Sequence, residues 1–250
     1  MKRLTLLALC LLAGPVLAST APPYSFKPDT TNTSSLQRGA RDFMNYCSGC
    51  HSLKYLRYNR LGKDLEIPDD LLKQHLMFTS EKPGDHILSS MPAASKDPTA
   101  PSASETWFGR SPPDLSLTAR ERGPDWVYSY LMTFYLDPTR PTGVNNLVLP
   151  GASMPHVLGQ LQGYQKLIVD PPGEPAPHGG HKPKFELVQA GSLSPADYKA
   201  TVADLTNFMV YAAEPGRNGR MALGAGVLAF VVLFGIFAYL LKVEYWKDVH

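Results

Sequence analysis

The two longest apolar stretches of this chain lie at its two ends. The first, Leu4 to Leu12, follows Met1-Lys2-Arg3 and precedes small residues that end at Ala18. A short positive region, an apolar run and a small-residue site form a secretory signal. The run is too short for a membrane span, which needs roughly 20 apolar residues. The sequence therefore predicts a signal peptide over residues 1–18 and export of the chain that follows.

The second apolar stretch, Met221 to Leu241, contains no charged residue. At about 1.5 Å per residue it is long enough to cross about 30 Å of hydrocarbon, so it predicts one transmembrane helix over residues 221–241. Basic residues flank both of its ends, so the positive-inside rule does not orient it. The signal peptide does: residues 19–216 would lie outside the membrane, and residues 242–250 would form a cytoplasmic tail.

Between these stretches, apolar residues recur mainly at helical spacing, and the exported domain is expected to be mainly α. Two segments, 80–113 and 137–155, are rich in turn residues and are expected to be loops. Short apolar runs at 165–169 and 185–188 predict a small hairpin. Helices are expected over residues 34–46, 68–78, 115–122, 124–136 and 194–214. Their apolar faces contain Leu71, Leu72 and Leu76, then Trp126, Tyr130, Leu131 and Phe134, then Tyr198, Val202, Leu205, Phe208 and Met209.

The charge of the exported segment differs in sign from that of the whole chain. The full chain has a formal net charge of +2, but residues 19–216 contain 18 Lys and Arg against 20 Asp and Glu, or −2. A mildly acidic domain disfavours nucleic acid and suits a basic protein partner.

The sequence Cys47-Ser48-Gly49-Cys50-His51 is the most informative motif. C-x-x-C-H is the attachment signature of a c-type haem, in which two thiols bond the porphyrin and the histidine is the proximal iron ligand. The alternatives are a thioredoxin-type redox pair and half of a zinc site, although the chain has no second Cys/His pair. The third cysteine, Cys10, lies in the predicted signal peptide, which leaves no thiol for a structural disulfide.

A haem that only carries electrons favours two axial ligands, and a methionine sulfur raises its potential relative to a second histidine. Met91 and Met154 each precede a proline in a predicted loop. We favour Met154 because its loop comes after the central helices and before the last one, where a class I cytochrome c fold crosses the distal face. Met44 is too close to the motif, and three others occupy apolar helix positions typical of a core. These core candidates are Met77, Met132 and Met209; the rival histidines are His75, His86 and His156.

Together these motifs resemble the cytochrome c1 family of ubiquinol:cytochrome c reductase (the cytochrome bc complex), in its proteobacterial form. The resemblance covers the whole chain and rests on residues 44–60, on Pro112-Pro113-Asp114-Leu115-Ser116, on residues 154–158 and on Tyr211-Ala212-Ala213-Glu214-Pro215 before the anchor. It implies a class I cytochrome c-like haem domain with long loop insertions and one C-terminal transmembrane helix.

The resemblance also implies one covalently attached haem c, with His51 and Met154 as iron ligands and Pro113 beside the haem. It implies that an arginine contacts a haem propionate; Arg122 fits this position, with Arg120 as its neighbour. Two features depart from the family pattern. The stretch from Arg122 to Trp126 is one residue shorter, and Trp126 stands where a tyrosine is expected.

The function implied by the resemblance is that of an electron-transfer subunit without bond-making chemistry or a catalytic residue of its own. It would accept electrons from a Rieske iron-sulfur protein and pass them to a soluble or anchored cytochrome c. With cytochrome b, it would belong to a dimeric complex in the inner membrane, with its haem domain in the periplasm. The alternatives are a free-standing anchored cytochrome that shuttles electrons and a haem enzyme such as a peroxidase, which needs an open iron site.

Overall fold

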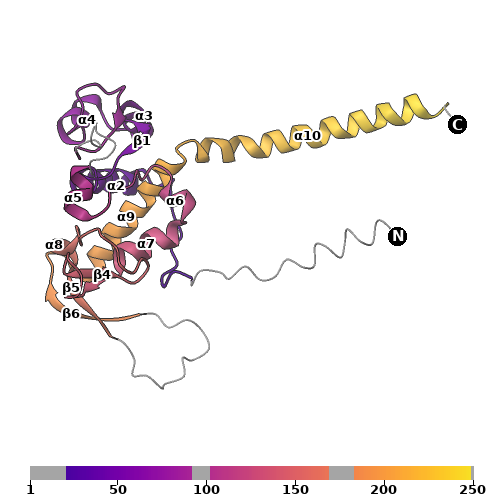
Figure 1. Ribbon diagram of the computed structural model, residues 1–250. Coiled ribbons are helices and arrows are strands. Elements are labelled where there is room, and N and C mark those ends of the chain that lie inside the picture. Colours follow the sequence, from indigo (N-terminus) through magenta and orange to yellow (C-terminus); the bar gives the residue numbers. More distant parts are fainter. Residues whose placement is uncertain (1–20, 92–101, 169–182, 249–250) are drawn as a thin grey trace, which may run out of the picture.

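The computed structural model describes residues 21–91, 102–168 and 183–248. The predicted signal peptide, residues 1–18, lies outside the described residues. In the described part of the chain, two long helices, α2 (Thr33–Tyr46) and α9 (Pro195–Ala213), cross at the centre of the domain (Figure 1). A Cβ on Gly39 of α2 would lie 2.2 Å from the carbonyl oxygen of Asp204 in α9, so the two backbones approach this closely only because residue 39 is a glycine.

Both α2 and α9 begin at a side-chain cap. Asn32 accepts a hydrogen bond from the Ser35 amide at the start of α2, and Ser194 accepts one from the Asp197 amide at the start of α9. The predicted apolar face of α9 is buried, with Phe208 tilted against Phe43 of α2 at a ring distance of 5.6 Å. The crossing of α2 and α9 therefore forms the middle of the hydrophobic core.

Shorter helices surround this crossing, and α7 follows Gly123, whose φ of 88° is unfavourable for other residues. Tyr198 of α9 donates a hydrogen bond to the Leu131 carbonyl of α7 at 2.8 Å, which joins these two helices inside the core. These helices are α3 (Tyr58–Asp64), α4 (Asp69–His75), α5 (Ala103–Phe108), α6 (Thr118–Glu121), α7 (Pro124–Met132) and α8 (Gly159–Gln162).

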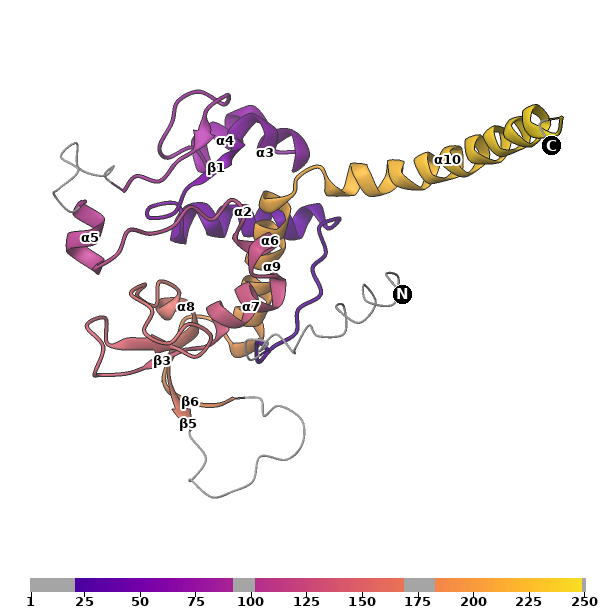
Figure 2. The ribbon, with the colours of Figure 1, turned by 45° about the vertical axis from the view of Figure 1, so that its right-hand side comes forward.

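Three antiparallel strand pairs complete the described part of the domain. The β5–β6 pair is the predicted hairpin, and it extends away from the body in both views (Figures 1 and 2). The strands are β1 (Leu53–Arg57) with β2 (His86–Ile87), β3 (Phe134–Leu136) with β4 (Val144–Asn146), and β5 (Gly163–Ile168) with β6 (Lys184–Ala190).

The mainly helical prediction is confirmed, but several local predictions are wrong. The predicted loops 80–113 and 137–155 contain β2, α5 and β4. The α5 helix forms because Ser102 and Glu105 make a capping box and Gly109 ends the helix in a left-handed conformation. Phe134 belongs to strand β3 rather than to a helix face.

Two helix predictions are also corrected in detail. The segment predicted as helix over 115–122 is helical only in α6, and before α6 the Leu115 amide donates to the Ser52 carbonyl. Leu71, expected on a buried face, is 44% exposed, since α4 covers the core mainly with Leu72.

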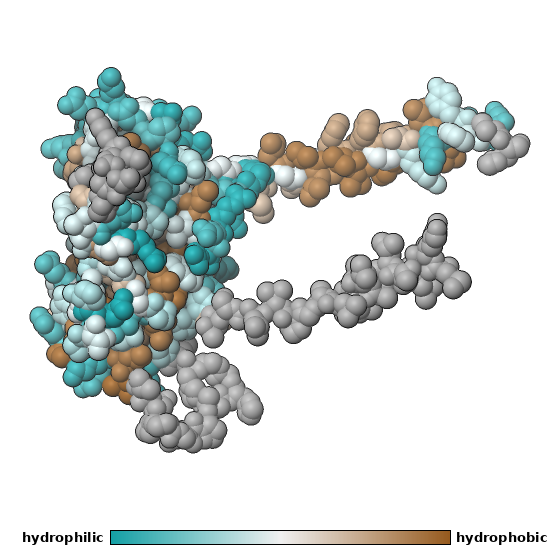
Figure 3. Space-filling model, in the orientation of Figure 1, coloured by the Kyte–Doolittle hydropathy of each residue, from teal (hydrophilic) through white to brown (hydrophobic). Residues whose placement is uncertain are grey.

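The C-terminal helix α10 (Arg217–Trp246) extends well away from the domain (Figures 1 and 2), and none of its residues is buried. Its apolar surface forms a continuous band with polar residues near its C-terminal end (Figure 3). Within the part of the chain that the structure describes, it alone is long and apolar enough to cross a membrane. The helix extends beyond the predicted span at both ends.

Candidate haem-binding site

The C-x-x-C-H motif continues directly from the end of α2. The Cys47 amide bonds to the Phe43 carbonyl, and the His51 amide bonds back to the Cys47 carbonyl at 2.8 Å, so the motif is a compact turn on the helix end. Cys47 is buried, Cys50 is half-buried, and both thiols are free. A single turn therefore presents the two thiols and the imidazole together.

The thiols do not have the properties of a redox pair. Burial raises the pKa of Cys47 to about 12 and also raises the pKa of Cys50, whereas catalytic thiols of the thioredoxin type have lowered pKa values. Among the residues that the structure describes, no three His, Cys, Asp or Glu side chains gather into a metal-binding cluster. The raised pKa values of the two thiols count against a thioredoxin-type redox pair.

The orientation of His51 is set by Pro113. Its Nδ1 lies 2.7 Å from the Pro113 carbonyl oxygen, which can only accept, so Nδ1 carries the proton and Nε2 keeps a free lone pair. Burial lowers the pKa of His51, although the bond to Pro113 opposes this, and the neutral ring is therefore favoured. A neutral imidazole with a fixed tautomer is the form in which histidine binds iron.

The segment around Pro113 is held against the residues that follow the motif. The Leu115 amide donates to the Ser52 carbonyl at 2.9 Å, and the Lys54 amide donates to the Asp114 carboxylate at 2.9 Å. The Asp114 and Leu115 contacts thus hold the chain directly after Pro113 against the residues that follow the motif, which gives a structural reason for the P-P-D-L-S element.

Met154 lies half-buried in the loop between β4 and α8. The Tyr130 hydroxyl lies 3.5 Å from its sulfur and donates to it, because a thioether has no proton to give. Burial raises the pKa of Tyr130 to about 12, so the hydroxyl is protonated at neutral pH. Met91 follows Ser90, whose hydroxyl bonds to the Gly49 carbonyl, and so lies beside the attachment turn itself.

The remaining candidate ligands have other environments. His75 is exposed on α4, His86 belongs to β2, and His156 stacks on Phe134 at 4.9 Å. Burial lowers the pKa of His156 to about 4, although Gln162 opposes this. The methionines assigned to the core from the sequence are buried there, and Met44 is buried as well. The core methionines are Met77, Met132 and Met209.

Asn146, which the sequence pattern does not single out, holds the Met154 loop in place. Its side chain is fully buried and donates to the Tyr130 carbonyl at 2.7 Å. Its carbonyl oxygen accepts from the amides of Val148 and Leu149 at 2.9 and 3.1 Å. One side chain therefore joins the start of the loop to α7.

The two candidate propionate ligands differ in their present partners. Arg120 lies 3.7 Å from Glu214, which also pairs with Arg220 at the start of α10. Arg122 is more than half exposed, lies 3.6 Å from the Glu121 carboxylate, and lies over the Trp126 ring at 5.6 Å. Each arginine therefore already has an acidic neighbour, and the two are equal candidates for a propionate.

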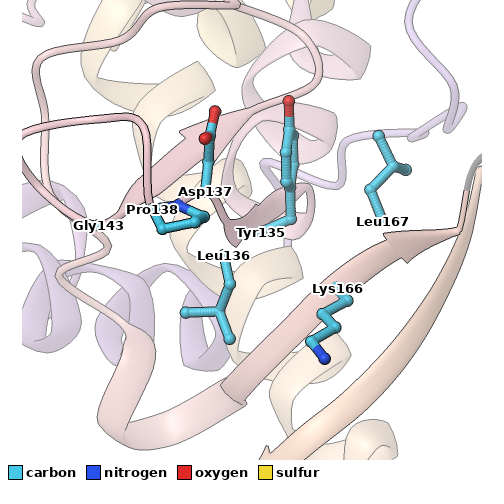
Figure 4. Close-up of a pocket in the computed structure, with 7 residues that line it drawn as sticks. All are labelled: Tyr135, Leu136, Asp137, Pro138, Gly143, Lys166 and Leu167. Atoms are coloured by element: carbon cyan, nitrogen blue, oxygen red, sulfur yellow. The ribbon is translucent and has the colours of Figure 1, made fainter.

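A separate pocket lies between the β3–β4 and β5–β6 hairpins (Figure 4). It shares no residue with the C-x-x-C-H turn or with the Met154 loop, so it is not the haem site. Its lining residues are Tyr135, Leu136, Asp137, Pro138, Gly143, Lys166 and Leu167.

Comparison with known proteins gives a consistent result. Residues 25–161 and 186–249 match a family described as the Cytochrome C1 family. The chain is 48% identical to cytochrome c1 of Allochromatium vinosum over the full length of both proteins. It is 43% identical to the ammonia monooxygenase gamma subunit of Nitrosomonas europaea over 89% of this chain and 86% of that protein. It is 28% identical to cytochrome c1 of Rhodospirillum rubrum over 86% of this chain and 81% of that protein. The chain belongs to the cytochrome c1 family.

Proposed function

We propose that this chain is the c-type haem subunit of a cytochrome bc complex, accepting electrons from a Rieske iron-sulfur protein and passing them to a cytochrome c. The observation that carries this proposal is the His51 tautomer fixed by the Pro113 carbonyl beside two free thiols. Two thiols, a neutral imidazole nitrogen and a thioether fit one covalent haem c with His/Met ligation. Bound there, the haem supplies one-electron chemistry.

Each residue of the chain has a defined task in this proposal. Cys47 and Cys50 would hold the porphyrin, and His51 and Met154 would bind the iron. Arg122 or Arg120 would pair with a propionate through a charged hydrogen bond. If both His51 and Met154 bind the iron, no open site is left for a peroxidase-type substrate, which favours electron transfer over haem enzyme chemistry.

The membrane placement follows from the two ends of the chain. The signal peptide exports the haem domain, residues 19–216, to the periplasm, the span 221–241 crosses the inner membrane, and residues 242–250 remain in the cytoplasm. The anchor keeps the haem beside cytochrome b and the iron-sulfur donor within a dimeric complex. The relative from Nitrosomonas europaea carries a different name, but the match to Allochromatium cytochrome c1 has higher identity and covers more of the chain.

Purification in mild detergent tests this function against the free-standing shuttle. Co-elution of the chain with b-type haem and an iron-sulfur protein supports the complex subunit, whereas a stable lone cytochrome supports the shuttle. Truncation after Gly216 gives a second test. Cells that carry only the truncated chain should lose quinol oxidation even when haem is attached, and full activity would contradict the role in the complex.

A further inference from the structure

The ring of Tyr130 packs between two other aromatic side chains in a column. Trp126 stacks on it at 5.0 Å with an interplanar angle of 6°, and Phe134 meets it edge-on at 5.1 Å. His156, two residues after Met154, stacks on Phe134 at 4.9 Å. Because neighbours on both sides fix the ring, its hydroxyl has a fixed direction.

That hydroxyl points to the sulfur of Met154, at 3.5 Å. The loop carrying Met154 is also fastened to the same tyrosine through its backbone, since Asn146 donates to the Tyr130 carbonyl at 2.7 Å. Tyr130 therefore contacts the loop at two points, one at its beginning and one at Met154. A thioether sulfur has two lone pairs, so it can bind iron with one and accept the hydroxyl with the other.

We propose that Tyr130 is a positioning residue for Met154 whose hydroxyl raises the reduction potential of the haem by drawing electron density from the sulfur. The proposal rests on the proposed function, and in particular on Met154 as iron ligand. A sulfur that shares density with a donor is a weaker ligand for ferric iron, which needs that density more than ferrous iron does. The hydrogen bond therefore disfavours the oxidised state, in the way that partners of metal ligands tune metals generally.

Tyr130→Phe tests this idea, because it removes the hydroxyl and keeps the aromatic column. A net hydrogen bond corresponds to about a threefold to tenfold change in an equilibrium constant. We expect the one-electron reduction constant to fall by that factor, or about 30 to 60 mV, since tenfold equals about 59 mV for one electron. Potentiometric titration of the detergent-purified, haem-loaded protein measures this shift.

Titration of the oxidised protein with imidazole separates electronic tuning from simple packing. If the hydroxyl polarises the sulfur, Met154 becomes a better ferric ligand in Tyr130→Phe, and about threefold more imidazole is needed to displace it. If Tyr130 only fills space, imidazole displaces Met154 at the same or a lower concentration, and the proposal is overturned. An unchanged potential overturns it as well.

Two further variants make the result specific. Tyr128→Phe removes a hydroxyl from the same helix, but the Tyr128 ring stacks on Phe26 at 4.9 Å rather than on the aromatic column around Tyr130. The haem potential and the imidazole titration of this variant should therefore match those of the parent protein. Met154→Leu tests the ligand itself. If it loses the sulfur-to-iron absorption band while Tyr130→Phe behaves like the parent, the role of Tyr130 is wrong and the ligand assignment stands. If it keeps the band, both are wrong.

Discussion

Replacing Asn146 with alanine should loosen the Met154 loop more than any exposed substitution does. The Asn146 side chain is fully buried, and its hydrogen bonds connect the Tyr130 carbonyl with the amides of Val148 and Leu149. Alanine can make none of these bonds. The two amides would be left without their partner near the start of the loop.

The size of the effect follows from these orphaned groups. An unsatisfied buried donor costs about 1 to 3 kcal/mol. Val148 is half-buried, but Leu149 is exposed, so the Leu149 amide can bond to water and its loss costs less. The Tyr130 carbonyl adds less, because it also accepts a hydrogen bond from the Thr133 amide. For a domain of this size, each 1 kcal/mol lowers the melting temperature by roughly 2 to 4 °C. We therefore expect a decrease of roughly 6 to 12 °C for about 3 kcal/mol.

Thermal melts of the haem-loaded protein, followed by two signals, measure this effect. The sulfur-to-iron absorption band reports the Met154 loop, and far-ultraviolet circular dichroism reports the helices. In Asn146→Ala the band should disappear at a lower temperature than the helical signal, since the lost bonds belong to the loop. Asn146→Asp keeps an oxygen that can accept from the two amides but loses the donor to the Tyr130 carbonyl, so it should fall between alanine and the parent protein.

Asn45→Ala, at an exposed position on α2, serves as the control and should melt like the parent protein. The reasoning is refuted if Asn146→Ala loses the band at the parent's temperature. It is also refuted if the interval between the temperature at which the band is lost and the temperature at which the helical signal is lost is the same in Asn146→Ala as in the parent protein. In that case the loop is not the part that Asn146 stabilises.

Three other predictions concern attachment, ligation and packing. Replacing Cys47 or Cys50 with alanine should abolish or severely impair haem attachment, because His51 alone cannot hold the porphyrin; normal haem staining of the double variant on a denaturing gel would contradict it. Met154→Leu should remove the sulfur-to-iron band and lower the potential by roughly 0.1 V or more, with the fold kept because the volume is nearly conserved. Gly39→Ala should cost about 3 kcal/mol, measured by denaturant unfolding, because its Cβ would lie 2.2 Å from a backbone carbonyl of α9.

The helices that the sequence predicts well are those whose signals are local. In α2 and α9, a capping side chain, a helical apolar period and a terminal break all fall within one segment. The strands β1 and β3 are not predicted, because their signals are not local. They are five and three residues long, and their partners β2 and β4 lie in segments that read as loops. A short strand is defined by its partner, which the local pattern does not contain.

The residues of the candidate site also differ in whether a local sequence signal reveals them. The thiols and the imidazole follow from five adjacent residues, and their positions relative to α2 need no tertiary information. Asn146 gives no signal in the sequence, because an asparagine in a turn-rich segment is usually a turn residue. Only the fold shows that it is fully buried beneath the loop and bonded to Tyr130.

The two proposed iron ligands, His51 and Met154, should therefore respond differently to substitutions around them. His51 adjoins Cys50, so covalent attachment of the porphyrin would itself keep the imidazole close to the iron. Met154 has only non-covalent support, from Tyr130 and from the loop that Asn146 fastens. Substitutions beside His51 therefore risk the attachment of the haem as a whole. Substitutions on α7 and in the Met154 loop would change the strength of one proposed iron ligand while the haem stays attached, so we expect the Met154 side to be where the potential can be adjusted.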